Sequence, residues 1–93
     1  MSNDYRRTVI IVNQRGLHAR ASAKFVNAVT ELPDSVLVTV AKDGTQASGG
    51  SILGLMMLGA AKGDTIELQV SGEGSQQALD QLCALVDGGF GED

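Results

Sequence analysis

The feature that most constrains the fold is the alternation of strand-like and helix-like apolar patterns along the 93 residues. Residues 8–12 are β-branched or apolar, while residues 35–41 and 65–71 alternate between apolar and polar side chains. Both patterns are typical of β-strands with a buried face. Apolar residues recur at spacings near 3.6 in residues 19–30 and again after Ser75, which predicts two amphipathic helices.

Two shorter elements complete the pattern. Residues 42–44 form a tight-turn signal, after which residues 45–48 should return as a partner strand. Residues 52–58 are apolar and follow Ser51, a good helix N-cap residue. The predicted order is therefore β-α-β-β-α-β-α. This order favours a two-layer α+β fold, with the first and last helices covering one face of a four-stranded, mainly antiparallel sheet.

The length suits one domain over residues 1–93, and no repeat or linker interrupts it. We expect an ordered core over about residues 7–88. Residues 1–6 should be frayed, and residues 89–93 should form a mobile acidic tail after the last helix. The first helix should bury a stripe of mostly small residues, namely Ala19, Ser22, Ala23, Val26 and Val29.

The composition excludes several function classes. A net charge of −4 and only three aromatic residues argue against a nucleic-acid binder. No apolar run reaches the roughly 18 residues of a membrane span, and the N-terminus lacks a secretion segment, so we expect a cytoplasmic protein. Cys83, the only cysteine, has no disulfide partner and fits the packed face of the last helix. We expect neither a metal nor a cofactor.

The charge is unevenly distributed along the chain. After Lys62 there is no basic residue, whereas Asp4 is the only acidic residue among the first 30. The basic residues in that first part are Arg6, Arg7, Arg15, Arg20 and Lys24. Taken singly, each is most simply a solvated surface charge. Together they predict that the end of the molecule carrying His18 is locally basic and attracts anions.

His18, the only histidine, is the candidate centre of chemistry. It follows Gly16 at a strand-to-helix junction, where the first amides of the helix lack internal acceptors and favour an anion. Arg20 adds a planar cation suited to phosphate. A lone histidine is often only structural, but these features indicate a phosphoryl group carried on His18. The chain has no Walker-type loop, so the donor should be another protein.

Two further features carry alternative interpretations. Ser51 could act only as an N-cap, or it could also be phosphorylated, since a phosphate at a helix N-terminus leaves the fold intact. The helix over residues 52–58 is apolar nearly all round. Part of it must be core, and we expect Leu53 and Met56 to be its exposed members and to form a protein-docking patch.

With these residues in view, the chain resembles the HPr family, the histidine phosphocarriers of the bacterial phosphoenolpyruvate-dependent phosphotransferase system. Residues 16–20 match the active-site signature, and residues 51–63 match the serine-site segment. The resemblance implies an open-faced β-sandwich and a phosphohistidine on Nδ1 of His18, formed by enzyme I and passed to enzyme IIA proteins, with Arg20 assisting. In part of the family a HPr kinase/phosphorylase modifies the serine that matches Ser51, which weakens exchange with enzyme I.

One position departs from the pattern of the family. Most members have proline directly after the arginine, where this chain has Ala21. Because alanine is a strong helix former, the helix should survive with a looser first turn. The pair Ala21-Ser22 and the ending of the chain are more similar to the nitrogen-related branch, NPr. The sequence leaves open whether the acceptor serves sugar uptake or regulation, and whether Ser51 is modified.

Three functions can be compared on these observations. The leading one is a monomeric phosphocarrier that is not itself an enzyme. The alternative is a regulatory interaction module that acts through Ser51 and residues 52–58, with His18 incidental. An autonomous enzyme is the weakest hypothesis, because no second catalytic group stands out beside His18.

Overall fold

The computed structural model describes residues 4–92. Its elements follow the predicted order, with a short 3₁₀ helix added at the end. They are β1 (Tyr5–Ile10), α1 (Ala19–Thr30), β2 (Leu37–Lys42), β3 (Thr45–Ser48), α2 (Ile52–Met57), β4 (Thr65–Ser71), α3 (Ser75–Asp87) and η1 (Gly89–Gly91).

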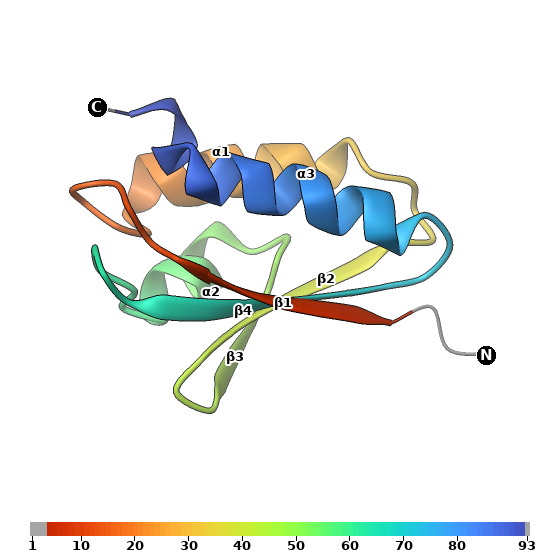
Figure 1. The fold of residues 1–93 in the computed structure, drawn as a ribbon, viewed down its shortest axis with the longest axis horizontal. Coiled ribbons are helices and arrows are strands. Elements are labelled where there is room, and N and C mark those ends of the chain that lie inside the picture. The colour runs from red at the N-terminus through yellow and green to blue at the C-terminus, as the bar shows by residue number, and fades with distance from the viewer. Residues whose placement is uncertain (1–3, 93) are drawn as a thin grey trace.

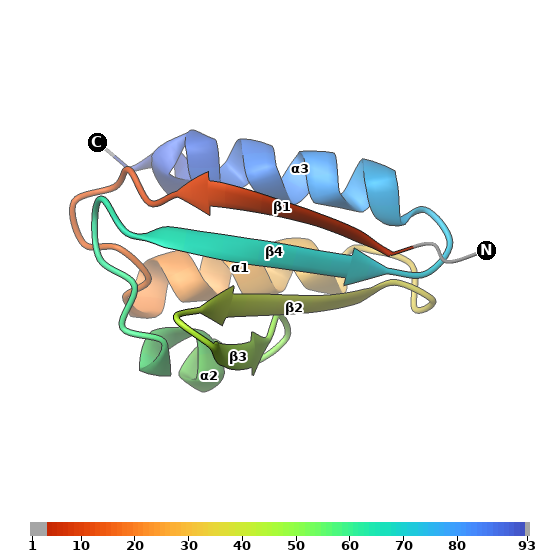
Figure 2. The ribbon, with the colours of Figure 1, turned by 60° about the horizontal axis from the view of Figure 1, so that its bottom comes forward.

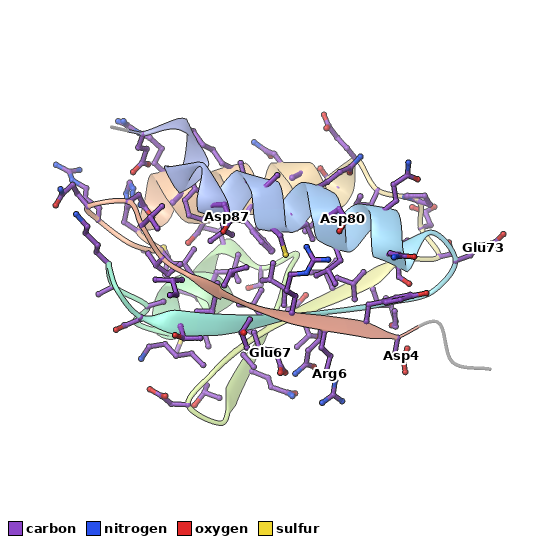
Figure 3. The ribbon with its side chains drawn as sticks, in the orientation of Figure 1. Asp4, Arg6, Glu67, Glu73, Asp80 and Asp87 are labelled. Carbon is purple, nitrogen blue, oxygen red and sulfur yellow. The ribbon has the colours of Figure 1, made fainter. Side chains whose placement is uncertain are left out.

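The strands form one antiparallel sheet in the order β1-β4-β2-β3. Helices α1 and α3 lie side by side over one face of it (Figures 1 and 2). The other face is left open by the helices, and Arg6 and Glu67 project from it (Figure 3). The predicted two-layer α+β architecture is therefore confirmed.

The core lies between the sheet and the two long helices. Val36, Val38 and Val40 point into it from β2 and the residue before it, as their alternation predicts. The helices contribute larger side chains, since Phe25 is 1% exposed and Leu82 is 1% exposed. Burial of one such side chain contributes roughly 1.5–3 kcal/mol. The last helix buries the face that the apolar spacing after Ser75 predicts, and its buried residues there are Ala78, Leu79, Leu82, Cys83 and Val86.

The predicted stripe of the first helix is partly wrong. Ser22 is buried, but Ala19 is exposed, and the fully buried residues beside Ser22 are Ala21 and Phe25. Phe25 determines the orientation, because a large aromatic ring gains most from burial. Val26 and Val29 are only partly buried against the core.

The first strand begins and ends earlier than predicted. It covers Tyr5–Ile10, paired with β4 from Tyr5–Val70 to Ile10–Thr65. Tyr5 and Arg6 are therefore in the sheet and not frayed. Pairing with β4 satisfies the hydrogen-bonding groups of their backbone, and this does not depend on the type of side chain. The first three residues lie outside the described part of the chain.

The C-terminal segment also differs from the expectation of a mobile tail. Gly89–Gly91 form a 3₁₀ turn in which Phe90 is only 1% exposed. The gain from burying this ring explains why the segment packs onto the domain. Ordered structure thus continues to Glu92, and Asp93 lies outside the described residues.

The start of α3 requires a smaller correction. A helix that begins after Ser75 would have this serine as its N-cap, but Gly74 takes that place with a φ of 87°, and Ser75 is the first helical residue. A glycine adopts this left-handed conformation without steric cost. Within residues 4–92, no helix combines the length and the apolar character that crossing a membrane requires.

Candidate functional site

The loop between β1 and α1 is held against the segment that follows α2. The amide of Leu17 donates to the carbonyl oxygen of Ala60 at 2.9 Å, and the Leu17 side chain is buried. Gly16 has a φ of +60°, and a Cβ there would lie 2.2 Å from the same oxygen. Glycine is therefore required at this contact, which brings the next residue but one, His18, to the start of α1.

His18 is the N-cap of α1. Its backbone is extended, with φ −76° and ψ −177°, and its carbonyl accepts from the amide of Ser22 at 2.9 Å. Its side chain makes no capping hydrogen bond, so the imidazole is available for other contacts. The imidazole is 22% exposed, so the ring is accessible and lies beside the first amides of a twelve-residue helix. Such amides favour an anion.

The ring of His18 lines an open hollow of about 460 Å³. The other lining residues are Gln14, Arg15, Arg20, Lys24, Gly91 and Glu92. Three cations therefore line the same hollow as the histidine, as the uneven charge of the sequence predicts. The other two basic residues of the first segment lie elsewhere. Arg6 is on the open face of the sheet (Figure 3), and Arg7 pairs with Asp80 of α3 at 2.8 Å.

Glu92 is a site residue that the sequence reasoning missed. Its Oε2 lies 2.9 Å from Nε2 of His18, and its Oε1 accepts from Nδ2 of Asn13 at 3.1 Å. The hydrogen bond with His18, partly opposed by desolvation, and the bond from Asn13 hold the pKa of Glu92 below its usual value. Glu92 is thus an ionised carboxylate at neutral pH. The sequence holds one sign of this packing, the aromatic Phe90 in a segment that we expected to be a mobile acidic tail.

The N-terminal turn of α1 is regular despite the alanine at position 21. Ala21 is the third residue of the helix, so its amide has no acceptor within the helix. The bond from Ser22 to His18 has an ordinary length of 2.9 Å. The helix therefore survives as expected, and this distance gives no sign of the looser turn.

Ser51 is the N-cap of α2. Its Oγ accepts from the amide of Gly54 at 2.9 Å, and its backbone is extended. The predicted capping role is confirmed. The side chain is partly exposed.

Helix α2 divides into a buried and an exposed side. Leu55 is fully buried, whereas Leu53 is 68% and Met56 is 40% exposed, as predicted. Ile52 and Met57 are exposed as well. We call these four exposed side chains, Ile52, Leu53, Met56 and Met57, the α2 patch.

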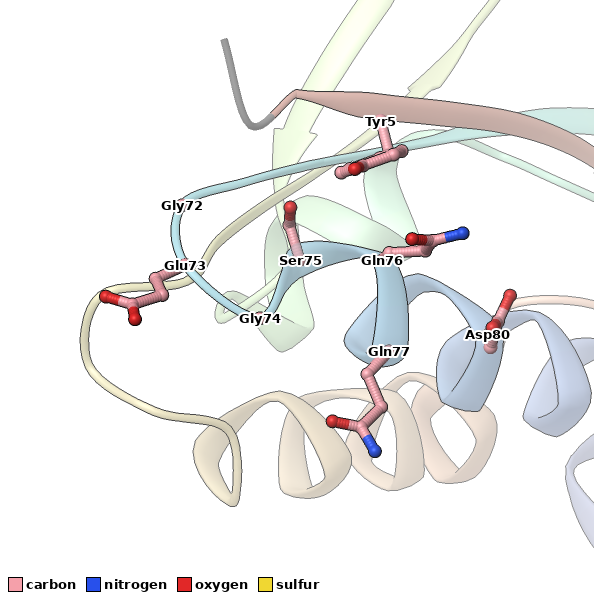
Figure 4. A pocket seen from close by; sticks show the side chains of 8 residues that line it. All are labelled: Tyr5, Gly72, Glu73, Gly74, Ser75, Gln76, Gln77 and Asp80. Carbon is pink, nitrogen blue, oxygen red and sulfur yellow. The ribbon is translucent and has the colours of Figure 1, made fainter. Parts of the chain in front are cut away.

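A second hollow lies at the other end of the molecule, around the turn between β4 and α3 (Figure 4). Its eight lining residues include the carboxylates of Glu73 and Asp80, and none of the lining residues within 4–92 is a cation. This arrangement does not suit a phosphoryl group. Cys83 is also no candidate, because it is buried in the core and its burial raises the pKa of the thiol.

Comparison with known proteins shows the family to which the chain belongs. Residues 5–87 match the protein family described as "PTS HPr component phosphorylation site". The phosphocarrier protein HPr of Neisseria meningitidis serogroup A is 44% identical over 87 residues, which cover 94% of this chain and 96% of that protein. The phosphocarrier protein NPr of Shewanella violacea is 42% identical over 86 residues, or 92% of each chain.

A solved structure extends the comparison to the fold. The crystal structure of HPr-C-His from Thermoanaerobacter tengcongensis has a TM-score of 0.88 to this chain at 34% identity. The superposition covers 96% of this chain and 98% of the other. The chain belongs to the HPr family of phosphocarrier proteins of the phosphotransferase system.

Proposed function

We propose that the protein accepts a phosphoryl group on His18 from enzyme I, with phosphoenolpyruvate as the ultimate donor, and passes it to enzyme IIA proteins. The observation that carries this proposal is the accessible imidazole of His18 at the N-terminus of α1, in a hollow with three cations. The cations and free amides would stabilise the charge of the group during transfer. Arg20, with its fork of donors, would assist most directly.

The protein would act as a carrier and not as an enzyme. The phosphoramidate on His18 is reactive enough to pass its group onward, so the chain needs no further catalytic group. Enzyme I would supply the phosphoryl group, and the enzyme IIA proteins would take it from His18. We expect this exchange in the cytoplasm, with the chain acting as a monomer.

Ser51 would be a regulatory phosphorylation site where the host has a HPr kinase/phosphorylase. A phosphate on this N-cap would lie at the start of α2, where the helix dipole favours negative charge. It would also add charge beside the α2 patch, whose exposed Leu53 and Met56 suit an apolar partner surface. Docking of enzyme I at this patch would then be weakened by the modification.

Phosphorylation by purified enzyme I and phosphoenolpyruvate tests the proposal. We expect one acid-labile phosphoryl group on the wild-type chain and on Ser51→Ala, and none on His18→Ala. Labelling of His18→Ala would show that His18 is not the acceptor. If the wild type is not labelled, the alternative applies, a regulatory module that acts through Ser51 and α2. Transfer from the labelled chain to a panel of enzyme IIA proteins would distinguish sugar uptake from nitrogen or carbon regulation.

A further inference from the structure

The imidazole of His18 is held by a residue from the far end of the chain. Nε2 of His18 lies 2.9 Å from Oε2 of Glu92, although the two residues are 74 positions apart in the sequence. Nδ1, the other ring nitrogen, is left free of this bond. Which nitrogen carries the proton therefore depends on Glu92.

The segment that presents Glu92 is anchored to the domain through Phe90. Phe90 is buried, and its carbonyl oxygen accepts from Nζ of Lys24 at 2.7 Å. The amide of Glu92 donates to the carbonyl of Gly89 at 3.0 Å. In Figures 1 and 2, the C-terminal segment turns back at the end where the loop after β1 lies. Glu92 is thus placed by the fold and not by a loose tail.

Asn13 fixes the orientation of the Glu92 carboxylate. It is 2% exposed, and its Nδ2 donates both to the carbonyl of Gly16 at 2.9 Å and to Oε1 of Glu92 at 3.1 Å. Its Oδ1 has no hydrogen-bond partner among residues 4–92. Turning the amide over would bring Oδ1 against two acceptors, so Asn13 must present its amino group to Glu92.

The donor and acceptor roles in the pair follow from charge. An ionised carboxylate can only accept hydrogen bonds, and the contacts with His18 and Asn13 keep Glu92 ionised by lowering its pKa. Nε2 must then donate. In the neutral ring the proton is on Nε2, and Nδ1 has a free lone pair.

We propose that Glu92 is a positioning residue that holds His18 in the tautomer with Nδ1 free to accept a phosphoryl group. This role rests on the proposed function. In the transfer step the Nδ1 lone pair forms the new bond to phosphorus. The bond from phosphorus to the donor group on enzyme I breaks, and its electron pair leaves with that group. Nε2 keeps its proton, and the positive charge gained by the ring is balanced by the Glu92 carboxylate.

Substitution by glutamine separates this role from a structural one. In Glu92→Gln, the side-chain oxygen would stay opposite the amino group of Asn13, so the new amino group would face Nε2 of His18. Nε2 would then have to accept a hydrogen bond. The ring proton would move to Nδ1, the nitrogen that must attack the phosphorus. Glu92→Ala removes the contact and leaves the ring to its intrinsic preference, which is the proton on Nε2. Glutamine at position 92 should therefore slow the phosphorylation of His18 more than alanine does.

Two measurements on the 93-residue chain test the proposal. The first is the ¹⁵N NMR spectrum of the imidazole, recorded at alkaline pH. It should show the proton on Nε2 in the wild type and in Glu92→Ala, and on Nδ1 in Glu92→Gln. The second is the rate constant of phosphorylation by enzyme I. It should fall roughly tenfold or more in Glu92→Gln, and less in Glu92→Ala. Glu73→Gln, at the opposite end (Figures 3 and 4), is the matched control and should change neither.

The outcomes separate this proposal from the proposed function. If the wild type accepts no phosphoryl group while its spectrum shows the Nε2 proton, the carrier function fails but the tautomer assignment stands. If the wild type is phosphorylated and Glu92→Gln has the wild-type tautomer, or reacts at least as fast as Glu92→Ala, the positioning role is overturned.

Discussion

Gly16 and the carbonyl of Ala60 are so close that a single added carbon at Gly16 would lie 2.2 Å from the oxygen. The same oxygen accepts from Leu17, so this contact places the loop that carries His18. The site therefore depends on a long-range backbone contact as well as on the local sequence around the histidine.

Gly16→Ala should lower the free energy of unfolding by more than the cost of backbone strain alone. The left-handed conformation of an alanine costs about 1–2 kcal/mol, and displacement of the Ala60 carbonyl adds to this. Gly59→Ala is the matched control, because Gly59 has a similar φ of +67° and a Cβ added there would meet nothing within 4 Å. Urea denaturation should show a larger loss of unfolding free energy for Gly16→Ala than for Gly59→Ala. Equal losses would mean that the loop can move away from Ala60 without cost.

The two sides of α2 should respond differently to truncation. Leu55→Ala should lower the free energy of unfolding by about 2–5 kcal/mol, because it leaves a cavity in the core. Met57, which is 76% exposed, should tolerate alanine within about 0.5 kcal/mol. Chemical denaturation of both variants checks this. A large loss for Met57→Ala would show that the α2 patch is not a free surface.

Ser51 has a capping role that can be separated from any phosphorylation. Ser51→Ala should cost about 1 kcal/mol, because the amide of Gly54 loses its acceptor, whereas asparagine caps nearly as well as serine. Ser51→Asn should thus keep the stability of the wild type while removing the phosphorylation site. Thermal or urea unfolding of the two variants measures the difference. If Ser51→Asn were as unstable as Ser51→Ala, the hydrogen bond to Gly54 would not be the source of the effect.

The stability contributed by Glu92 should depend on pH with a defined sign. Its pKa is lowered in the folded protein, mainly by the hydrogen bond with His18. The contribution is therefore fully present above the ordinary glutamate pKa of about 4.3 and is lost as the pH falls through the lower folded value. The wild type should be more stable than Glu92→Gln at pH about 6, and the two should converge in acid. If the difference in stability between the wild type and Glu92→Gln grew in acid, this would contradict the lowered pKa of Glu92.

The parts of the fold that follow from local pattern could be predicted from the sequence. The alternation in β2 and β4 determines which face is buried, and the turn at Asp43 and Gly44 is set by their positive φ values of 50° and 84°. The starts of α1 after His18 and of α2 after Ser51 also follow from their own segments, although the contact with Ala60 places the loop that carries His18. These are short-range preferences that a single segment carries.

The features that were missed depend on distant partners. The bounds of β1 are set by its pairing with β4, and Arg7 is drawn to Asp80 of α3. Glu92 reaches His18 only because burial of Phe90 folds the C-terminal segment back onto the domain. No periodicity in a short glycine-rich segment indicates such a contact, so its position could not be derived from the sequence.

The most direct test of the carrier mechanism is to locate the phosphoryl group in the phosphorylated protein. After reaction with enzyme I and phosphoenolpyruvate, the uniformly ¹⁵N-labelled chain should be examined by NMR for coupling between phosphorus and the ring nitrogens of His18. We expect one phosphoryl group, bonded to Nδ1, with Nε2 still protonated. A phosphoryl group on Nε2, or on a residue other than His18, would contradict this mechanism.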